Sequence, residues 1–153
     1  MGPRLHLSIQ IETASPVPSR AQLRRWVAGA LASQRGTIDD ATFTLRFVDA
    51  REARALNRSY RGRDYATNVL TFPFDGPDDR QAIADIVVCM PVVVKEARAQ
   101  HKTAHDHCAH LVVHGVLHAT GHDHETPKEA DAMEAVERRV LARFRIADPY
   151  AQQ

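Results

Sequence analysis

The sequence predicts an α+β fold in which a mixed sheet of about four strands packs with several helices. Strand-like and helix-like patterns interleave early in the chain, helix-like patterns dominate later, and no segment repeats at a fixed period. The chain has 153 residues, of which 44% are hydrophobic, and this size and composition are typical of one globular domain. We therefore expect residues 1–153 to form a single domain.

Four segments have the periodicity and composition of β-strands. Between Leu5 and Thr13, apolar and polar residues alternate as in a half-buried strand. Residues 42–47 alternate in the same way, with aromatic and β-branched residues that favour strands. Thr67 to Phe72 and Ala84 to Met90 are apolar and rich in strand formers. The turn-forming residues from Pro73 to Asp79 predict an exposed loop between these last two strands.

Capping residues and apolar faces predict two helices in the first half of the chain. After Ser19, a suitable N-cap, apolar residues recur at three- and four-residue steps as far as about Gln34. Asp49 and Glu52 stand three residues apart, as in a capping box, and are expected to begin a short second helix. This helix should end near Tyr60.

Three further helices are predicted in the second half. Pro91 can occupy the first turn of one helix, and His105 to Ala119 should form the next, which Gly121 ends. Thr126-Pro127-Lys128-Glu129 has the pattern of a capping box with proline in the first helical position. The last helix is expected to run to about Arg145.

The composition indicates neither a membrane protein nor a strongly basic one. The formal net charge is +1 at pH 7, so any binding of nucleic acid would have to come from a local basic patch. No apolar run reaches the roughly 20 residues needed to span a bilayer. Cys89 and Cys108 form no framework of pairs, which suits buried, free thiols in a reducing compartment. We therefore expect a soluble intracellular protein.

Eight of the nine histidines fall between His101 and His124, a density that points to metal binding. His114 and His118 are four residues apart, so on a helix they share one face and can approach one ion. Gly121 can adopt a left-handed conformation, which lets the chain turn back and offer His124 as a third ligand. The pattern H-x-x-x-H-x-x-G-x-x-H therefore predicts one zinc ion per chain, on a helix followed by a glycine turn.

The predicted zinc site is open and hydrolytic, because three imidazoles leave a fourth coordination position, whereas four protein ligands usually close a structural site. The spacing matches the zinc-binding part of the metzincin peptidase signature. However, Gly115 stands where those peptidases have a glutamate. A metallopeptidase would need another carboxylate as its base, such as Glu125 or Asp85.

Other residues of the histidine stretch have more than one interpretation. His110 is too far along the helix axis from His118 to share an ion with it easily, and is kept only as an alternative ligand or relay. His122 is the alternative to His124 as the third ligand. Asp123 can either accept the free N–H of a ligating histidine or cap the turn with its carboxylate.

A basic stripe lies on the predicted second helix and just after it. Its members recur at helical steps and then continue past the helix end: Arg51, Arg54, Arg58, Arg61 and Arg63. Inside a nearly neutral protein, such a stripe is a candidate path for an RNA backbone. The alternative is an ordinary solvated helix face. Four aromatic residues flank the stripe and could stack on bases: Tyr60, Tyr65, Phe72 and Phe74. Phe72 lies on a predicted strand, which favours a place in the core instead.

Two stretches closely resemble the signature stretches of the YbeY family. They are Asn68-Val69-Leu70-Thr71-Phe72-Pro73 and His114-Gly115-Val116-Leu117-His118-Ala119-Thr120-Gly121-His122-Asp123-His124. The resemblance extends to residues 56–62, 85–88 and 148–150, and so covers most of the chain. The sequence departs from the family pattern at Tyr65-Ala66 and at Ala84, positions that bear on loop shape and not on the metal.

The resemblance implies a bacterial or organellar cytoplasmic protein with one zinc ion on His114, His118 and His124. It implies a single-strand-specific endoribonuclease that matures the 3′ end of 16S rRNA and acts in ribosome quality control. Its partners would be rRNA and the small ribosomal subunit with its proteins, and no DNA is expected. The family's functionally important arginine falls on Arg61, which we expect to stabilise negative charge during catalysis. A non-catalytic, zinc-stabilised module that docks on ribosomal components is a further interpretation.

Overall fold

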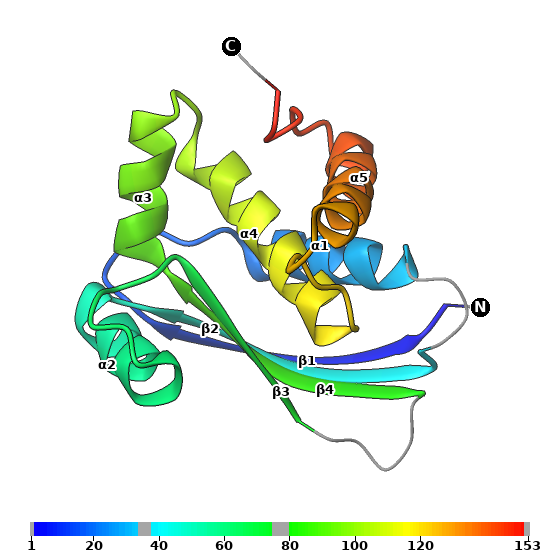
Figure 1. The fold of residues 1–153 in the computed structure, drawn as a ribbon, viewed down its shortest axis with the longest axis horizontal. Coiled ribbons are helices and arrows are strands. Elements are labelled where there is room, and N and C mark those ends of the chain that lie inside the picture. The colour runs from blue at the N-terminus through cyan, green and yellow to red at the C-terminus, as the bar shows by residue number, and fades with distance from the viewer. Residues whose placement is uncertain (1, 34–37, 75–79, 152–153) are drawn as a thin grey trace.

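The computed structural model describes residues 2–33, 38–74 and 80–151 and has the α+β fold expected from the sequence (Figure 1). The mixed sheet of these residues has four strands: β1 (Arg4–Glu12), β2 (Asp40–Val48), β3 (Val69–Phe74) and β4 (Gln81–Cys89). The helices of the same part of the chain are α1 (Arg20–Ala32), α2 (Ala50–Arg61), α3 (Met90–Ala99), α4 (Ala104–Ala119) and α5 (Pro127–Arg143).

The strands lie in the order β1-β2-β4-β3. β1 is parallel to β2 and β2 is parallel to β4, whereas β3 is antiparallel to β4. Parallel neighbours need a long connection, which α1 provides between β1 and β2, and α2 with β3 provides between β2 and β4. Pro73 is paired with Ala84 of β4. A proline is tolerated here because β3 is an edge strand of the described sheet, so the missing N–H disrupts no second neighbour.

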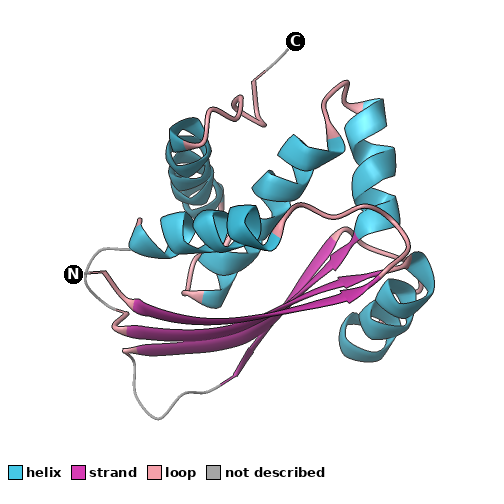
Figure 2. Ribbon diagram, turned by 180° about the vertical axis from the view of Figure 1, so that it is seen from behind, coloured by secondary structure: helices cyan, strands magenta, loops and turns pink. Residues whose placement is uncertain are grey.

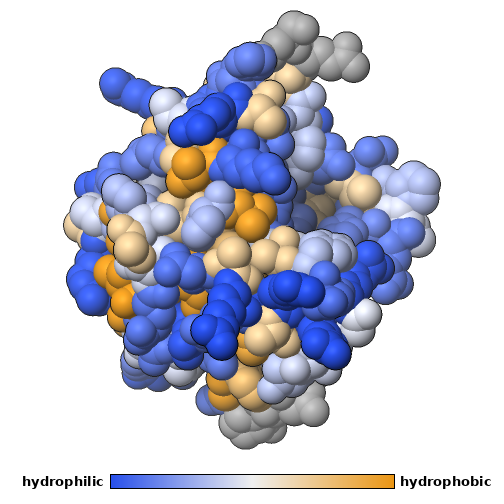
Figure 3. All heavy atoms as spheres, turned by 90° about the vertical axis from the view of Figure 1, so that its left-hand side faces the viewer, coloured by the Kyte–Doolittle hydropathy of each residue, from blue (hydrophilic) through white to orange (hydrophobic). Residues whose placement is uncertain are grey.

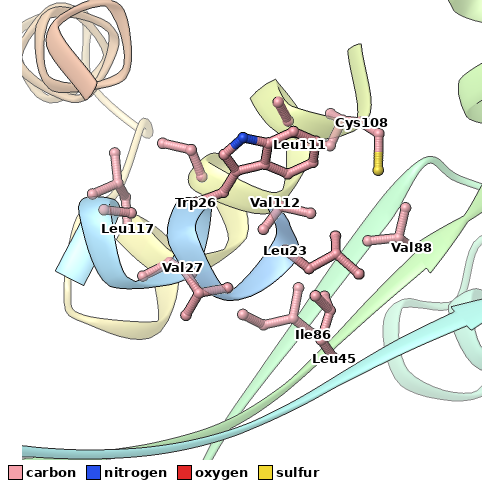
Figure 4. Close-up of a cluster of buried hydrophobic side chains, with 14 of the residues drawn as sticks. Leu23, Trp26, Val27, Leu45, Ile86, Val88, Cys108, Leu111, Val112 and Leu117 are labelled. Atoms are coloured by element: carbon pink, nitrogen blue, oxygen red, sulfur yellow. The ribbon is translucent and has the colours of Figure 1, made fainter. Parts of the chain in front are cut away.

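α1, α3, α4 and α5 lie on one side of the sheet, and α2 lies against the opposite face at one end (Figures 1 and 2). In the main core, Leu23 and Trp26 of α1 lie with Val112 of α4 above Ile86 of β4 (Figure 4). A smaller apolar cluster, which includes Ala53, joins α2 to the other face. Burial of one such large apolar side chain contributes about 1.5–3 kcal/mol, so the main core holds α4 firmly on the sheet.

Local capping determines the helix starts largely as predicted. Ser19 and Thr126 accept a backbone N–H at the starts of α1 and α5, as predicted. Thr103 does the same at the start of α4, one residue earlier than the expected start at His105. Thr126 also forms the predicted reciprocal capping box with Glu129. Pro91 lies in the first turn of α3, where its missing N–H costs no helical hydrogen bond.

The predicted capping box at the start of α2 is wrong. Asp49 occupies the N-cap position, but its carboxylate makes no capping hydrogen bond. It accepts a hydrogen bond from the hydroxyl of Thr13 instead. Glu52 pairs with Arg46 of β2 at 2.5 Å. Both carboxylates therefore bind partners outside their own helix, and these tertiary partners replace the local cap.

Gln34, the predicted end of the first helix, and residues 75–79 of the predicted loop lie outside the described residues. Cys89 and Cys108 are free and buried, as expected. Burial raises the pKa of the Cys89 thiol and raises that of Cys108 to about 12. Across the described ranges, we find no helix that combines the length and apolar content of a membrane span.

Candidate metal centre

The end of α4 and the turn that follows it bring three histidines together. Gly121 has a φ of +106°, a conformation that side-chain-bearing residues rarely adopt. The backbone N–H of His122 donates to the carbonyl of Leu117 at 2.9 Å. This hydrogen bond closes the end of α4 and directs His124 back toward the helix. The predicted glycine turn is therefore present.

The rings of His114, His118 and His124 converge on one point. The centroid of His118 lies 4.7 Å from that of His114 and 4.8 Å from that of His124. The centroids of His114 and His124 are 5.7 Å apart. One ring nitrogen from each histidine lies within 4.8 Å of the other two. Tetrahedral zinc with Zn–N bonds of about 2.0–2.1 Å needs nitrogens about 3.3 Å apart, so small ring rotations suffice to bind an ion.

His118 is held in the protonation state that a metal requires. Burial, together with the neighbouring His114 and His124, lowers the pKa of His118 to about 4. A metal binds the neutral imidazole, so protons do not compete for His118 at neutral pH.

Gly115 allows α4 to lie close to the sheet. A Cβ atom at this position would be 2.7 Å from Cγ2 of Ile86 on β4 and 3.5 Å from Oγ1 of Thr71 on β3. Real Cβ atoms essentially never approach another heavy atom within 3.0 Å. A glutamate, which the metzincin peptidases use as their base, would therefore force Ile86 or the helix to shift.

A cleft of about 540 Å³ opens beside the three histidines, and Arg61 lies in its wall. Arg61 is the last residue of α2, which Gly62 ends with a φ of +68°. The buried Asn57 donates to the carbonyl of Tyr65 at 2.9 Å and so fixes the loop that follows. The remaining lining residues come from α2, β3 and the loop before β3: Tyr60, Thr67, Asn68, Val69, Leu70, Thr71, Phe72 and Pro73. The fold thus brings the predicted catalytic arginine to the predicted metal ligands.

The family model described as Endoribonuclease YbeY matches residues 8–145. Endoribonuclease YbeY of Bordetella pertussis is 53% identical over 154 residues and covers 98% of both chains. Endoribonuclease YbeY of Alkalilimnicola ehrlichii is 51% identical over 154 residues, which span 97% of this chain and 92% of that relative. The chain belongs to the endoribonuclease YbeY family.

A solved structure has a fold similar to that of this YbeY-family chain. The solution structure of TM1509 from Thermotoga maritima has a TM-score of 0.57 at 24% sequence identity, and the match covers 95% of this chain and 99% of that chain. At this identity the similarity concerns the fold alone.

Most of the predicted arginine stripe of this YbeY-family chain lies outside the cleft. Three of its members line a separate groove of about 370 Å³: Arg51, Arg54 and Arg58. Arg54 binds Asp64 through two hydrogen bonds of 2.8 and 3.0 Å, and Arg63 donates to the hydroxyl of Tyr65 at 3.5 Å. Figure 3 shows the end of the molecule that carries α2 and α3, where strongly hydrophilic side chains are interspersed with smaller apolar areas.

His122, Asp123 and His110 lie around the group of three histidines. The group of three nitrogens includes His124 and not His122. The carboxylate of Asp123 accepts the backbone N–H of His124 at 2.7 Å, which corresponds to its turn-capping alternative. The ring of His110 lies 6.3 Å from that of His114 and does not join the group of three.

Sequence reasoning missed Glu137 of α5, whose side chain contacts the candidate metal centre. It is 0% exposed, and its Oε1 lies 3.2 Å from Nδ1 of His114. Burial opposes ionisation, but hydrogen bonds from His110 and His114 outweigh it and lower the pKa of Glu137 to about 2. A sequence signal did exist. Glu137 stands four residues after Met133 and four before Leu141, so it occupies the apolar face of α5.

Proposed function

We propose that this chain is a zinc-dependent endoribonuclease that cuts single-stranded RNA, in maturation of the 3′ end of 16S rRNA and in ribosome quality control. The observation that carries the proposal is that Arg61 and the three histidines line the same cleft. Relatives named endoribonuclease, about half identical over nearly the whole chain, support RNA as the substrate. The proposed partners are rRNA and the small ribosomal subunit with its proteins, and the proposed location is the cytoplasm.

The donor set supports zinc as the metal. Three imidazole nitrogens suit zinc, whereas calcium and magnesium prefer oxygen ligands. Three protein ligands are also typical of catalytic rather than structural zinc sites. A bound zinc ion would supply Lewis-acid stabilisation to a phosphoryl oxygen in the cleft. We propose one ion per chain on His114, His118 and His124.

Arg61 is the proposed catalytic residue. Cleavage of a phosphodiester increases the negative charge on the phosphate in the transition state, and a fixed cation beside it lowers the barrier. A guanidinium group can bind two phosphate oxygens at once. Within the described ranges, Arg61 makes no side-chain hydrogen bond or ion pair that would occupy its donors. These donors are therefore available to the substrate.

The form of the cleft supports a single-stranded substrate. Double-stranded RNA is bound across a wide, shallow groove, whereas a flexible single strand can bend into a cleft and stack its bases on aromatic rings. Tyr60 is 69% exposed in the wall of the cleft and packs edge-to-face on Phe72, with ring centroids 4.9 Å apart. We therefore assign Tyr60 the role of stacking on a base beside the cut.

The other arginines are proposed as auxiliary contacts to the RNA backbone. Arg51, Arg54 and Arg58 lie on the helix that ends at Arg61, and Arg63 follows it. Phosphate contacts of this kind increase affinity for any sequence and weaken with salt. Arg54 contributes least in this scheme, because Asp64 already binds its guanidinium.

A metallopeptidase has less support. The position of the peptidase glutamate is occupied by Gly115, where the Cβ atom of a larger residue would clash with Ile86. Asp85, a candidate for a replacement base, lines a different cleft of about 660 Å³ together with Arg46. The lining of the histidine cleft includes neither Asp85 nor Glu125, the other candidate base.

Cleavage of a defined RNA tests the proposal. The zinc-loaded protein is given a labelled single strand that spans the 3′ end of a 16S rRNA precursor, and the same strand annealed into a duplex. We expect cuts in the single strand, loss of cutting after chelation, and recovery when zinc is restored. Tight binding without any cut would favour the docking module instead. A 2′,3′-cyclic phosphate product would identify the RNA 2′-hydroxyl as the nucleophile, and a 3′-hydroxyl product would identify water.

A further inference from the structure

Glu137 is the only fully buried carboxylate among the described residues. An ionised carboxylate is costly to bury unless other groups donate hydrogen bonds to it. A buried acid next to a candidate metal site therefore requires an explanation from its contacts.

Three donors surround the carboxylate of Glu137. One oxygen lies 3.2 Å from Nδ1 of His114. The other lies 2.5 Å from Nε2 of His110 and accepts the hydroxyl of Tyr150 at 2.9 Å. Both oxygens are thus occupied, and the carboxylate links α4, α5 and the segment after α5.

The segment after α5 is held so that Tyr150 reaches this carboxylate. Arg138 of α5 binds both oxygens of Asp148, at 3.1 and 3.0 Å. Asp148 also accepts the backbone N–H of Tyr150 at 2.8 Å. The guanidinium of Arg138 lies 5.3 Å from the centre of the Tyr150 ring, within the range of a cation–π contact. The position of the tyrosine hydroxyl is therefore fixed by contacts on two sides.

We infer that Glu137 is a positioning residue of the metal centre and that Tyr150 supports it. When Glu137 accepts the Nδ1–H of His114, it selects the tautomer whose Nε2 is unprotonated and able to bind a metal. The same hydrogen bond fixes the orientation of the imidazole ring. The inference rests on the proposed function in one respect, because it takes His114 as a metal ligand.

The same atoms suggest a competing arrangement with a second cation. Ligand atoms of His110, His114 and Glu137 lie within 4.8 Å of one another. A cation there would have to displace the hydrogen bonds that the two histidines make with the carboxylate. The positioning role keeps every contact that the structure has, and we therefore prefer it.

Zinc affinity measured by competition with a chromophoric chelator tests the inference. Glu137→Gln keeps the volume but removes the charge, and we expect zinc affinity to fall by about 10–100-fold. Tyr150→Phe removes only the supporting hydroxyl and should cause a smaller loss. Glu96→Gln is the matched control. Glu96 of α3 also lies 2.9 Å from a ring nitrogen of an α4 histidine, His107, but His107 is not one of the three candidate ligands. This control should keep the parent's affinity.

A purely structural role for Glu137 predicts a different result. It would lower the melting temperature of the metal-free protein but leave zinc affinity and the visible spectrum of the cobalt-substituted protein unchanged. Parent values of both quantities in Glu137→Gln and Tyr150→Phe would overturn the inference. Two tightly bound zinc ions per parent chain would also overturn it, in favour of the second cation.

Nitrogen NMR of the zinc-loaded parent gives an independent readout of the tautomer. We expect a proton on Nδ1 of His114, and a proton on Nε2 would contradict the inference. None of these measurements uses RNA. A parent that binds zinc in a Glu137-dependent manner but cuts no RNA would therefore support the positioning role and refute the proposed function.

Discussion

A Cβ atom added to Gly115 would lie 2.7 Å from Cγ2 of Ile86, so this pair sets how closely α4, which carries two of the candidate metal ligands, approaches β4. In a helix, alanine is intrinsically favoured over glycine by about 1 kcal/mol. Tight packing on the sheet therefore outweighs helix propensity at this position.

Gly115→Ala should destabilise the protein. Overpacking costs roughly 1–3 kcal/mol and the gain in helix propensity offsets about 1 kcal/mol of it, which leaves a net cost of up to about 2 kcal/mol. At about 2–4 °C per kcal/mol for a chain of this length, the melting temperature should fall by up to about 8 °C. Thermal unfolding of the metal-free protein measures the change. In the Ile86→Ala background, Gly115→Ala should lower the stability by a smaller amount, because the clashing methyl group of Ile86 is gone. Equal costs in the two backgrounds would show that the two residues are not coupled.

The fold was predictable where local chemistry decides it. The alternation of apolar and polar residues predicted the strand β1 correctly, and the capping box at Thr126 predicted the start of α5 correctly. Strand faces and helix caps depend on near neighbours in the chain, so a local pattern suffices for them. The Asp49 cap failed because Thr13, which lies far from it in sequence, takes its carboxylate. The closeness of Gly115 to Ile86 is likewise a property of packing and not of either segment alone.

The choice of the third ligand gives the second prediction. His124→Ala should remove most of the zinc from the purified protein, as should His114→Ala and His118→Ala. His122→Ala is the matched control, because His122 shares the turn but not the group of three nitrogens. Metal analysis after gel filtration provides the measurement. Loss of zinc from His122→Ala, with retention by His124→Ala, would reverse the assignment.

The pH dependence of the metal-free protein follows from His118. Burial and the neighbouring His114 and His124 lower its pKa to about 4, whereas an unfolded histidine has a pKa of about 6.5. Between these values the unfolded chain binds a proton that the folded chain does not. The free energy of unfolding should therefore decrease as the pH falls from about 6.5 to about 4. Denaturant titrations in chelator should show a shallower decrease for His118→Ala, and identical slopes would exclude this histidine as a cause.

The site was predictable only in part. The helical spacing of His114 and His118, with Gly121 beyond them, indicated the group of three from short-range geometry. The contact of Glu137 with His114 depends on how α5 packs against α4, which no local pattern encodes. The arginine stripe has helical periodicity, but periodicity alone does not show that Arg51 lines one groove and Arg61 another.

The last prediction concerns Arg61, which shares the cleft with the three histidines. If its guanidinium stabilises charge that grows in the transition state, Arg61→Ala should lower the single-turnover cleavage rate by about 10² or more. Zinc content and melting temperature should stay near those of the parent, because Arg61 is exposed at the end of α2. Arg61→Lys should recover little of the rate, since lysine keeps the charge but cannot bind two oxygens in the same way.

Arg58→Ala is the control for Arg61, because Arg58 lies on the same helix but lines the separate groove. Loss of its contact with the RNA backbone should weaken RNA binding. The slope of the affinity against salt concentration should decrease by the contribution of about one phosphate contact, and the rate at saturating RNA should change only modestly. The two variants thus separate catalysis from binding. Parent-like cleavage by Arg61→Ala, at saturating RNA and equal zinc occupancy, would remove Arg61 from the catalytic machinery. A rate loss of the same size in Arg58→Ala would instead indicate that the summed positive charge of α2, and not one positioned guanidinium, stabilises the transition state.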